Sequence, residues 1–190
     1  EADGHIGILV NNAGVIDMGP FAASDTDALV NLVNLNVRAL TELTSLVVPG
    51  MVKRGFGRIL NVASLAAFQP VPGMAAYAAT KAYVLALTEA LSEELKGSGV
   101  TVTALCPGVT DTDMATDIQA GSSAKLPRQL VSDPADVAAE GVKALMAGQV
   151  VVVPGFPNQV TAAWAQVTPH WLTRYVAGFA ARRTDWLKSP

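Results

Sequence analysis

Cysteine and histidine, the side chains that make disulfides and most zinc sites, are almost missing from this chain. Cys106 is the only cysteine among 190 residues, and His5 and His170 are the only histidines. An intrachain disulfide therefore cannot form, and there is no Cys/His cluster to hold a zinc ion. A chain without disulfides suits a reducing compartment, so we expect a cytoplasmic protein without a bound metal.

Long apolar runs and basic clusters are also missing. Uninterrupted apolar runs such as Val150–Val153 fall far short of the roughly 20 residues that span a bilayer, so we expect no transmembrane segment. The formal charge is −3, with no basic cluster before the last 20 residues, and nucleic acid is therefore not an expected partner. Hydrophobic residues make up 51% of the chain and charged residues 15%, which indicates a compact core and excludes general disorder.

Apolar runs that predict buried strands alternate with amphipathic stretches that predict helices. Strands are expected at 6–10, 58–62, 100–105 and 149–153, and helices from Ser24 to about Lys53, at 75–96 and from Asp133 to Gly148. This order predicts an α/β fold with a doubly wound parallel sheet, Rossmann-like and three-layered (α/β/α), with right-handed crossovers. We expect residues 1–155 to form this domain and 156–190 to form a helical extension packed on it.

The extension carries an aromatic stripe with basic residues around it. The stripe consists of Trp171, Tyr175, Phe179 and Trp186, and the charges come from Arg174, Arg182, Arg183 and Lys188. We expect the stripe to pack on the core of this chain or on a partner subunit. A substrate lid and a contact with a membrane surface are the alternatives.

Tyr77 and Lys81 are the first candidates for chemistry. They lie four residues apart in a predicted helix, so their side chains share one face. An ammonium group beside a phenol favours the ionised phenol, so we expect Lys81 to lower the pKa of Tyr77 and to make it a general acid/base near neutral pH. Ser64 precedes Tyr77 by 13 positions. Alone, Tyr-x-x-x-Lys is a short motif that many helices contain by chance.

Three further motifs flank this pair in a fixed order. They are Asn11–Gly14 (Asn-Asn-Ala-Gly), Asn36 in Asn-Val-Arg-Ala, and Pro107–Thr112 (Pro-Gly-Val-Thr-Asp-Thr). As a set, the motifs resemble those of the short-chain dehydrogenase/reductase family, and the resemblance covers about Gly4 to Val153. It implies an enzyme that transfers a hydride reversibly between a nicotinamide nucleotide and a carbonyl compound or secondary alcohol.

The resemblance implies a role for each of four catalytic residues. Tyr77 is the general acid/base, Lys81 lowers its pKa and holds the nicotinamide ribose, and Ser64 hydrogen-bonds the substrate oxygen. Asn36 holds a water molecule in a proton relay that starts at the lysine. Ala39 replaces the glycine of the family's Asn-Val-x-Gly motif. Asn31 and Asn34 lie near enough to be alternatives for the relay.

The cofactor-binding residues implied by the resemblance are Asn11, Ala13, Gly14, Tyr77, Lys81, Pro107, Gly108 and Thr112. The Gly-rich turn that binds the pyrophosphate is not in the sequence, because the first strand resembles the family's fourth. We therefore expect these residues to be part of a longer polypeptide, with an apolar first strand at an open sheet edge and weak nucleotide binding. The cofactor is NAD or NADP. The family slightly favours NADP, but the determinant is absent.

The apolar segment Leu65–Met74 and the region after Thr112, with Met114, Ile118 and Leu126, are expected to line the pocket of a lipophilic ketone or secondary alcohol. Glycine and serine at 121–123 suggest that this region closes over substrate. The family also implies a homodimer or homotetramer. One alternative is a non-enzymatic scaffold that keeps the fold, and another is an epimerase or dehydratase of the extended relatives. The scaffold has no need of four intact catalytic residues, and the second alternative fits Asn11–Gly14 and Pro107–Thr112 poorly.

Overall fold

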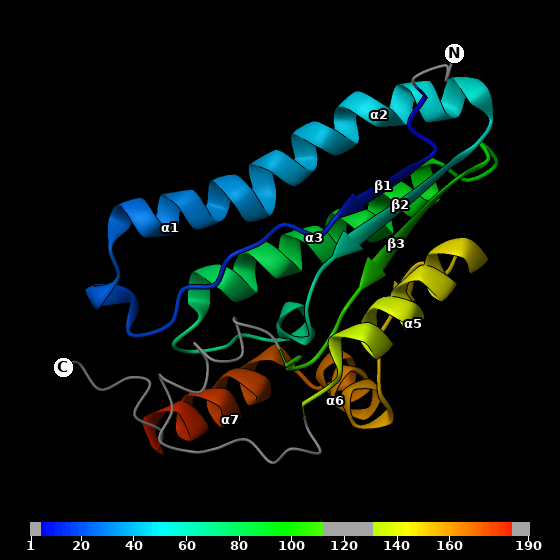
Figure 1. The fold of residues 1–190 in the computed structure, drawn as a ribbon. Coiled ribbons are helices and arrows are strands. Elements are labelled where there is room, and N and C mark those ends of the chain that lie inside the picture. Colours follow the sequence, from blue (N-terminus) through cyan, green and yellow to red (C-terminus); the bar gives the residue numbers. More distant parts are fainter. Residues whose placement is uncertain (1–4, 112–130, 184–190) are drawn as a thin grey trace.

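The computed structural model describes residues 5–111 and 131–183 and contains a parallel sheet between layers of helices (Figure 1). Its strands are β1 (Ile8–Asn11), β2 (Gly57–Val62), β3 (Val100–Leu105) and β4 (Val151–Val152), in the spatial order β1-β2-β3-β4. In register, Asn11 lies opposite Asn61, and Val62 lies opposite Leu105. The sheet and its layers confirm the predicted α/β fold.

The helices lie at the predicted positions, but a π-helical segment interrupts one of them. They are α1 (Thr26–Val33), α2 (Leu40–Arg54), α3 (Ala75–Glu94), α5 (Pro134–Ala147), α6 (Phe156–Val167) and α7 (His170–Arg183), with short 3₁₀ helices η1 (Phe21–Ala23) and η3 (Leu65–Phe68). The long helix expected from Ser24 to Lys53 is interrupted by a π-helical segment, η2 (Asn34–Ala39). The Asp25 carboxylate caps its start, and Gly55, with φ of 69°, ends it.

The two faces of the sheet are covered by different helices. Ile59 and Val102 point toward α2 and α3, where they pack with Met51 and Leu95. Alternate residues of the same strands point the other way, and there Leu60 and Leu105 pack with Val137 and Leu145 of α5. Every strand pair is parallel and the strand order runs in one direction. The β3–α5–β4 connection therefore has the opposite hand to the two before it, so the expectation that all crossovers are right-handed is wrong.

Strand β1 lies at an edge, and it pairs only with β2 in the part of the chain that the structure describes. Leu9 points toward α2 and packs there, whereas Ile8 and Val10 point to the face that α5 covers farther along the sheet. Both side chains are about half exposed, as is Ile6. Parallel strands are usually buried on both faces. The apolar, exposed first strand expected from the sequence is therefore present.

The C-terminal helices expose aromatic side chains that we expected to be packed on the core of this chain or on a partner subunit. Trp171 and Tyr175 of α7 are 64% and 66% exposed, so these two side chains of the aromatic stripe do not pack on the core of this chain. The residues of α7 that are buried are Thr173 and Ala181. Helix α6 contacts η3, next to the carboxyl ends of the strands (Figure 1). Trp186 and Lys188 lie outside the described residues.

We predict that Val10→Lys reduces self-association of the 190-residue chain, because a charge on an open edge strand opposes edge-to-edge pairing. Val142→Lys, a change at an equally exposed valine on α5, serves as the control. Light scattering over a range of protein concentrations measures the association. The same change for both variants would show that added charge, rather than the β1 edge, controls solubility.

Candidate active site

The loops that follow β2 and β3 meet at the carboxyl ends of the strands. The amide of Leu65 donates to the carbonyl oxygen of Pro107 over 2.8 Å, which ties the Ser64 turn to the Pro107–Gly108 turn. In open α/β sheets, ligands bind at this end. The structure therefore brings Ser64, Pro107 and Gly108 to one edge of the sheet. Thr112 lies outside the described residues, as do Met114, Ile118, Leu126 and residues 121–123.

Tyr77 stands in the first turns of α3 and points inward. Its side chain is only 7% exposed and packs with Leu32 and Met74. Burial raises the pKa of the Tyr77 phenol above its ordinary value, and a hydrogen bond with the Ser64 side chain opposes part of this rise. The expectation that Lys81 lowers the pKa of Tyr77 thus does not hold in this structure, because desolvation dominates. The phenol keeps its proton and can donate it.

Lys81 lies one helical turn after Tyr77 and is 5% exposed. Its Nζ donates to the carbonyl oxygen of Val62 over 2.8 Å and lies 5.7 Å from the centroid of the Tyr77 ring. Burial lowers the pKa of Lys81 to about 8, and the Cys106 thiol nearby opposes part of the shift. Lys81 can therefore exchange a proton with its surroundings at a pH close to neutral.

Asn36 lies in the π-helical segment η2, and such segments are frequent at functional sites. Its Nδ2 donates to the carbonyl oxygen of Val15 over 2.9 Å and to Oγ1 of Thr80 over 3.2 Å, and its Oδ1 accepts from the amide of Val15 over 2.9 Å. The alternatives Asn31 and Asn34 are exposed. Among the three asparagines, only Asn36 joins the loop after β1 to α3.

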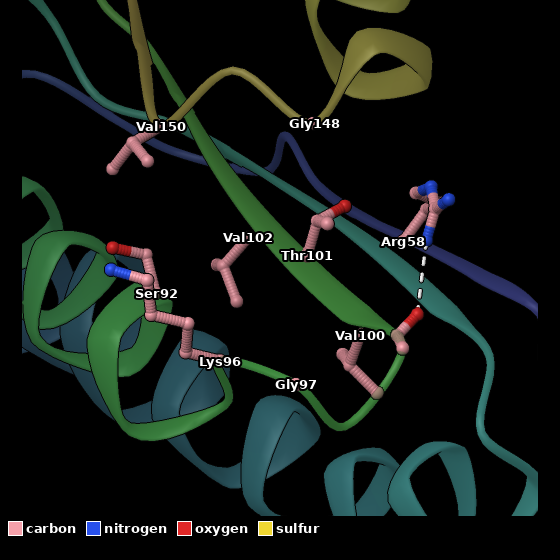
Figure 2. Close-up of a pocket in the computed structure, with 10 residues that line it drawn as sticks. Arg58, Ser92, Lys96, Gly97, Val100, Thr101, Val102, Gly148 and Val150 are labelled. Atoms are coloured by element: carbon pink, nitrogen blue, oxygen red, sulfur yellow. Dashed lines mark hydrogen bonds between the residues drawn. The ribbon is translucent and has the colours of Figure 1, made fainter.

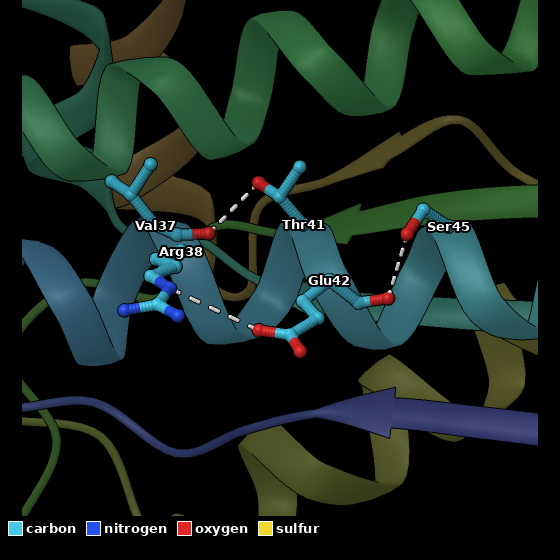
Figure 3. Close-up of polar contacts among 5 residues, drawn as sticks. All are labelled: Val37, Arg38, Thr41, Glu42 and Ser45. Carbon is cyan, nitrogen blue, oxygen red and sulfur yellow. Dashed lines mark hydrogen bonds and ion pairs between the residues drawn. The ribbon is translucent and has the colours of Figure 1, made fainter.

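The segment after Asn36 is held by side chains on α2 (Figure 3). Oγ1 of Thr41 donates to the carbonyl oxygen of Val37 over 2.8 Å, and Oγ of Ser45 donates to that of Glu42 over 2.8 Å. Arg38 and Glu42 face each other at 3.9 Å, but both are well exposed, so this pair contributes little stability. The hydroxyl groups bond carbonyl oxygens in the turn where the π-helix passes into α2.

Thr80 is a site residue that the sequence reasoning did not single out. Its Oγ1 accepts from Asn36 and donates to the carbonyl oxygen of Tyr77 over 2.8 Å. It thereby connects η2 to the helical turn that carries Tyr77 and Lys81. Its position three residues after Tyr77 placed it on the same helix face, and this was the available signal.

Asn11 holds the sheet to both helices of one face. Its Nδ2 donates to Oγ1 of Thr44 on α2 over 3.1 Å and to Oδ1 of Asn61 on β2 over 2.8 Å. Asn61 in turn donates to Oγ1 of Thr88 on α3 over 2.9 Å. All four side chains are buried. The Asn11 side chain is thus committed to this network, which leaves the backbone of its turn as the part that can approach a cofactor.

Gly14 lies directly against the side chains of Asn36 and Lys81. A Cβ atom at this position would lie 3.3 Å from Oδ1 of Asn36 and 3.4 Å from Nζ of Lys81. A side chain at position 14 would therefore crowd both polar groups, and glycine avoids this. Both ammonium hydrogens of Lys81 that do not bond Val62 remain available to a ribose hydroxyl. The residues therefore fit the nicotinamide-ribose end of a dinucleotide.

The Pro107–Gly108 turn packs directly against α6. A Cβ atom at Gly108 would lie 2.6 Å from Oδ1 of Asn158, which is closer than real Cβ contacts occur. Nδ2 of Asn158 donates to the carbonyl oxygen of Pro154 over 2.8 Å. Asn158 therefore fixes the outer side of this turn. The sequence contained no motif that singled it out.

Two hollows lie away from Tyr77. One of about 390 Å³ is lined by Arg58, Lys96, Thr101 and Gly148, at the amino ends of the strands (Figure 2). The other, of about 490 Å³, is apolar and lies between residues 67–72 and the alanines at 75, 78, 79 and 82 of α3. These alanines occupy the side of α3 opposite to Tyr77 and Lys81. Apolar residues of the Leu65–Met74 segment thus line a hollow, but Tyr77 is not part of its wall.

The family model described as short chain dehydrogenase matches residues 1–123. The chain belongs to this family. Ketoacyl reductase HetN of Nostoc sp. (strain PCC 7120) is 41% identical over 143 residues, which are 75% of this chain and 49% of that protein. Oxidoreductase UcpA of Escherichia coli K12 is 37% identical over 136 residues, 71% of this chain and 52% of the relative. The chain thus spans about half the length of these curated relatives.

Solved structures of the family have the same fold. A short-chain dehydrogenase from Sphingobium yanoikuyae in complex with NADPH is 33% identical with a TM-score of 0.73, and the match covers 96% of this chain and 65% of that one. A 3-ketoacyl-(acyl-carrier-protein) reductase from Brucella melitensis complexed with NADH is 29% identical with a TM-score of 0.69, covering 80% and 67%. These matches confirm the Rossmann-like fold of a short-chain dehydrogenase.

Residues 5–111 and 131–183 contain no group of three or more His, Cys, Asp or Glu side chains that could hold a metal ion. None of the helices in these ranges is long and apolar enough to cross a membrane.

We predict that Asn36→Ala lowers the free energy of unfolding by about 2–4 kcal/mol, because it leaves the backbone groups of Val15 and the hydroxyl of Thr80 unpaired inside the protein. Asn34→Ala, in the same π-helical segment but exposed, should cost far less. Urea unfolding followed by circular dichroism measures both. Equal losses would mean that the Asn36 amide does not hold the site together.

Lys81 should make stability depend on pH between 8 and 10. Its folded pKa lies below its ordinary value, so the unfolded state binds more protons in this window and stability due to Lys81 rises with pH. Above pH 10, the raised pKa of Tyr77 acts in the opposite direction. We therefore predict that wild type gains stability relative to Lys81→Met as the pH rises from 8 to 10. Parallel pH profiles in urea unfolding would contradict a buried, depressed lysine.

Proposed function

We propose that this chain is the proton-transfer half of an NAD(P)-dependent oxidoreductase, which interconverts a carbonyl compound and a secondary alcohol with Tyr77 as the general acid/base. The observation that carries the proposal is that the buried side chains of Tyr77 and Lys81 lie one helical turn apart at the carboxyl ends of the strands, with the half-buried Ser64 near enough to Tyr77 to influence its pKa. Family membership supports it. A non-enzymatic scaffold is not favoured, because such a protein needs no buried lysine beside a buried phenol.

Ser64 and Tyr77 act on the substrate oxygen. A bound nicotinamide nucleotide supplies or accepts the hydride. In reduction, negative charge develops on the carbonyl oxygen, and the hydroxyl groups of Ser64 and Tyr77 donate hydrogen bonds to it. Tyr77 then gives its proton to this oxygen, which is why a raised pKa suits the direction of reduction. In oxidation the same phenol must accept the proton, so the positive charge of Lys81 is needed to stabilise the phenolate.

Lys81 and Asn36 form the next part of the proton path. The pKa of about 8 lets Lys81 supply and regain a proton near neutral pH. The Asn36 amide uses both N–H groups on Val15 and Thr80, so Oδ1 is the atom of this amide that can accept a further hydrogen bond. Oδ1 of Asn36 and Nζ of Lys81 both lie close to Gly14, so a water molecule bound to both atoms would connect the two side chains. Asn36 thereby takes the relay role.

The cofactor-side residues are Gly14, Tyr77, Lys81, Pro107 and Gly108, with the backbone of Asn11 and Ala13. The solved relatives were bound to NADPH and NADH, and both remain candidates here. We retain the slight preference for NADP that the family implies. Thr112 keeps its proposed role as a contact of the nicotinamide carboxamide.

The substrate is proposed to be lipophilic. Tyr77 belongs to an apolar cluster with Leu32 and Met74, and Ile16, Met18 and Val71 pack against this cluster. A polar substrate would lose its hydration against such a wall without gaining partners. Two relatives are named as ketoacyl reductases, and a ketoacyl group has a carbonyl group on an apolar chain.

A cytoplasmic homodimer or homotetramer is the proposed assembly. On α3, Ala79, Ala86 and Ala90 are exposed, and their small side chains allow another helix to approach closely. Leu43 and Leu46 are exposed on α2 beside them. These surfaces are the ones that the family implies for the subunit contact.

Tyr77→Phe tests the reaction. Because the Gly-rich turn must come from elsewhere, the chain is joined behind the N-terminal half of an active relative, and NADPH and NADH oxidation is followed with a panel of apolar ketones. We predict that Tyr77→Phe lowers turnover by about 10²–10⁴-fold. Tyr83→Phe, on the same helix with its hydroxyl only on Thr41, should retain activity. A chimaera that binds nucleotide and turns over none of the ketones would favour the scaffold instead.

A further inference from the structure

Helices α6 and α7 bury small side chains and expose large ones. On α6 the buried residues are Ala162 and Ala165, and on α7 they are Thr173 and Ala181. The large apolar residues lie on the opposite sides, where Phe156 and Val167 are 77% and 80% exposed. An amphipathic helix that packs on its own core has the reverse arrangement. The outward faces of these helices therefore carry large apolar side chains that are exposed in the part of the chain that the structure describes.

The exposed residues follow the same spacing on both helices. On α6 they are Phe156, Val160, Trp164 and Val167, and on α7 they are Trp171, Tyr175, Phe179 and Arg182. In each set the residues stand at positions i, i+4, i+8 and i+11, which form one continuous stripe along a helix. We call these two stripes together the outer face of α6 and α7, because each lies on the side of its helix opposite to the buried residues. A monomer rarely exposes so many large apolar residues in series.

The positive charge of residues 156–183 favours a negatively charged partner over a second copy of this chain. Residues 156–183 contain Arg174, Arg182 and Arg183 and no aspartate or glutamate, whereas the whole chain has a net charge of −3. Arg174 and Arg182 are exposed. In a symmetric dimer the outer face would meet its own copy, so the arginines of one copy would face those of the other with no carboxylate between them. A second copy is therefore a poor partner for this face.

We propose that the outer face of α6 and α7 binds the surface of an anionic lipid membrane. Tryptophan and tyrosine suit the boundary between headgroups and acyl chains, and arginine can extend to lipid phosphates while its stem stays in the apolar layer. The helices lie in the surface plane and do not cross the bilayer. Because α6 contacts η3, next to Ser64, this position brings the membrane to the end of the sheet that carries the proposed reaction (Figure 1).

Sedimentation of the 190-residue chain with vesicles tests the proposal. Vesicles of phosphatidylcholine with phosphatidylglycerol should carry the chain into the pellet, and vesicles of phosphatidylcholine alone should carry much less. High salt should weaken the binding, because it screens the arginines. Trp171→Ser should reduce partitioning by about tenfold, and Arg182→Gln by about fivefold on the anionic vesicles only.

Phe21→Ser is the matched control, because Phe21 is as exposed as Trp171 but lies on η1, outside α6 and α7. It should leave partitioning unchanged, and thermal unfolding of all variants should match wild type because each altered side chain is exposed. Equal loss for Phe21→Ser and Trp171→Ser, or no binding to anionic vesicles, overturns the proposal. A fall in solution mass for Trp171→Ser without vesicle binding identifies a second copy as the partner. None of these residues takes part in the proposed reaction, so that proposal stands or falls separately.

Discussion

The side-chain amide of Asn36 is the contact on which the geometry of the site depends. It closes a pair of hydrogen bonds with the backbone of Val15 and reaches Thr80, which is bonded to the carbonyl oxygen of Tyr77. Three segments from distant parts of the chain are thereby fixed by one buried group. A buried amide with unmet hydrogen bonds is costly, so the arrangement has few alternatives of similar energy. This gives Tyr77 and Lys81 a rigid support.

A second network of buried polar side chains ties the helices of the site to the sheet. Asn11 and Asn61 lie side by side on neighbouring strands and bond the threonines of α2 and α3 that stand above them. The helices that carry Asn36, Tyr77 and Lys81 are therefore tied to the sheet by directional bonds as well as by apolar packing. Apolar contacts tolerate small shifts, whereas such bonds fix angles and register. A proton-transfer site requires this kind of precision because distances near 3 Å control it.

The sequence was sufficient where one local rule decided the outcome. Strand β3 runs from Val100 to Leu105 as predicted, because an apolar run between glycine and proline has few alternatives. The sequence did not reveal the π-helical segment η2. The amphipathic pattern of the surrounding helix continues across this segment, so nothing in the pattern marks it. The pKa of Tyr77 could not be predicted either, since the spacing of Tyr77 and Lys81 shows their proximity but not how deeply both are buried. Asn158 was missed for a similar reason, because its contact with Gly108 joins residues far apart in the chain.

The sequential order of the strands keeps the residues of the candidate site within one stretch of the chain. Each strand pairs with the next one in the sequence, so no strand has to insert between two strands that have already paired. The side chains of Ser64, Tyr77 and Lys81 and both polar networks thus come from one continuous stretch, Asn11 to Gly108. Under the proposed function, proton transfer is a property of this stretch alone, and the choice of nucleotide can vary without altering it.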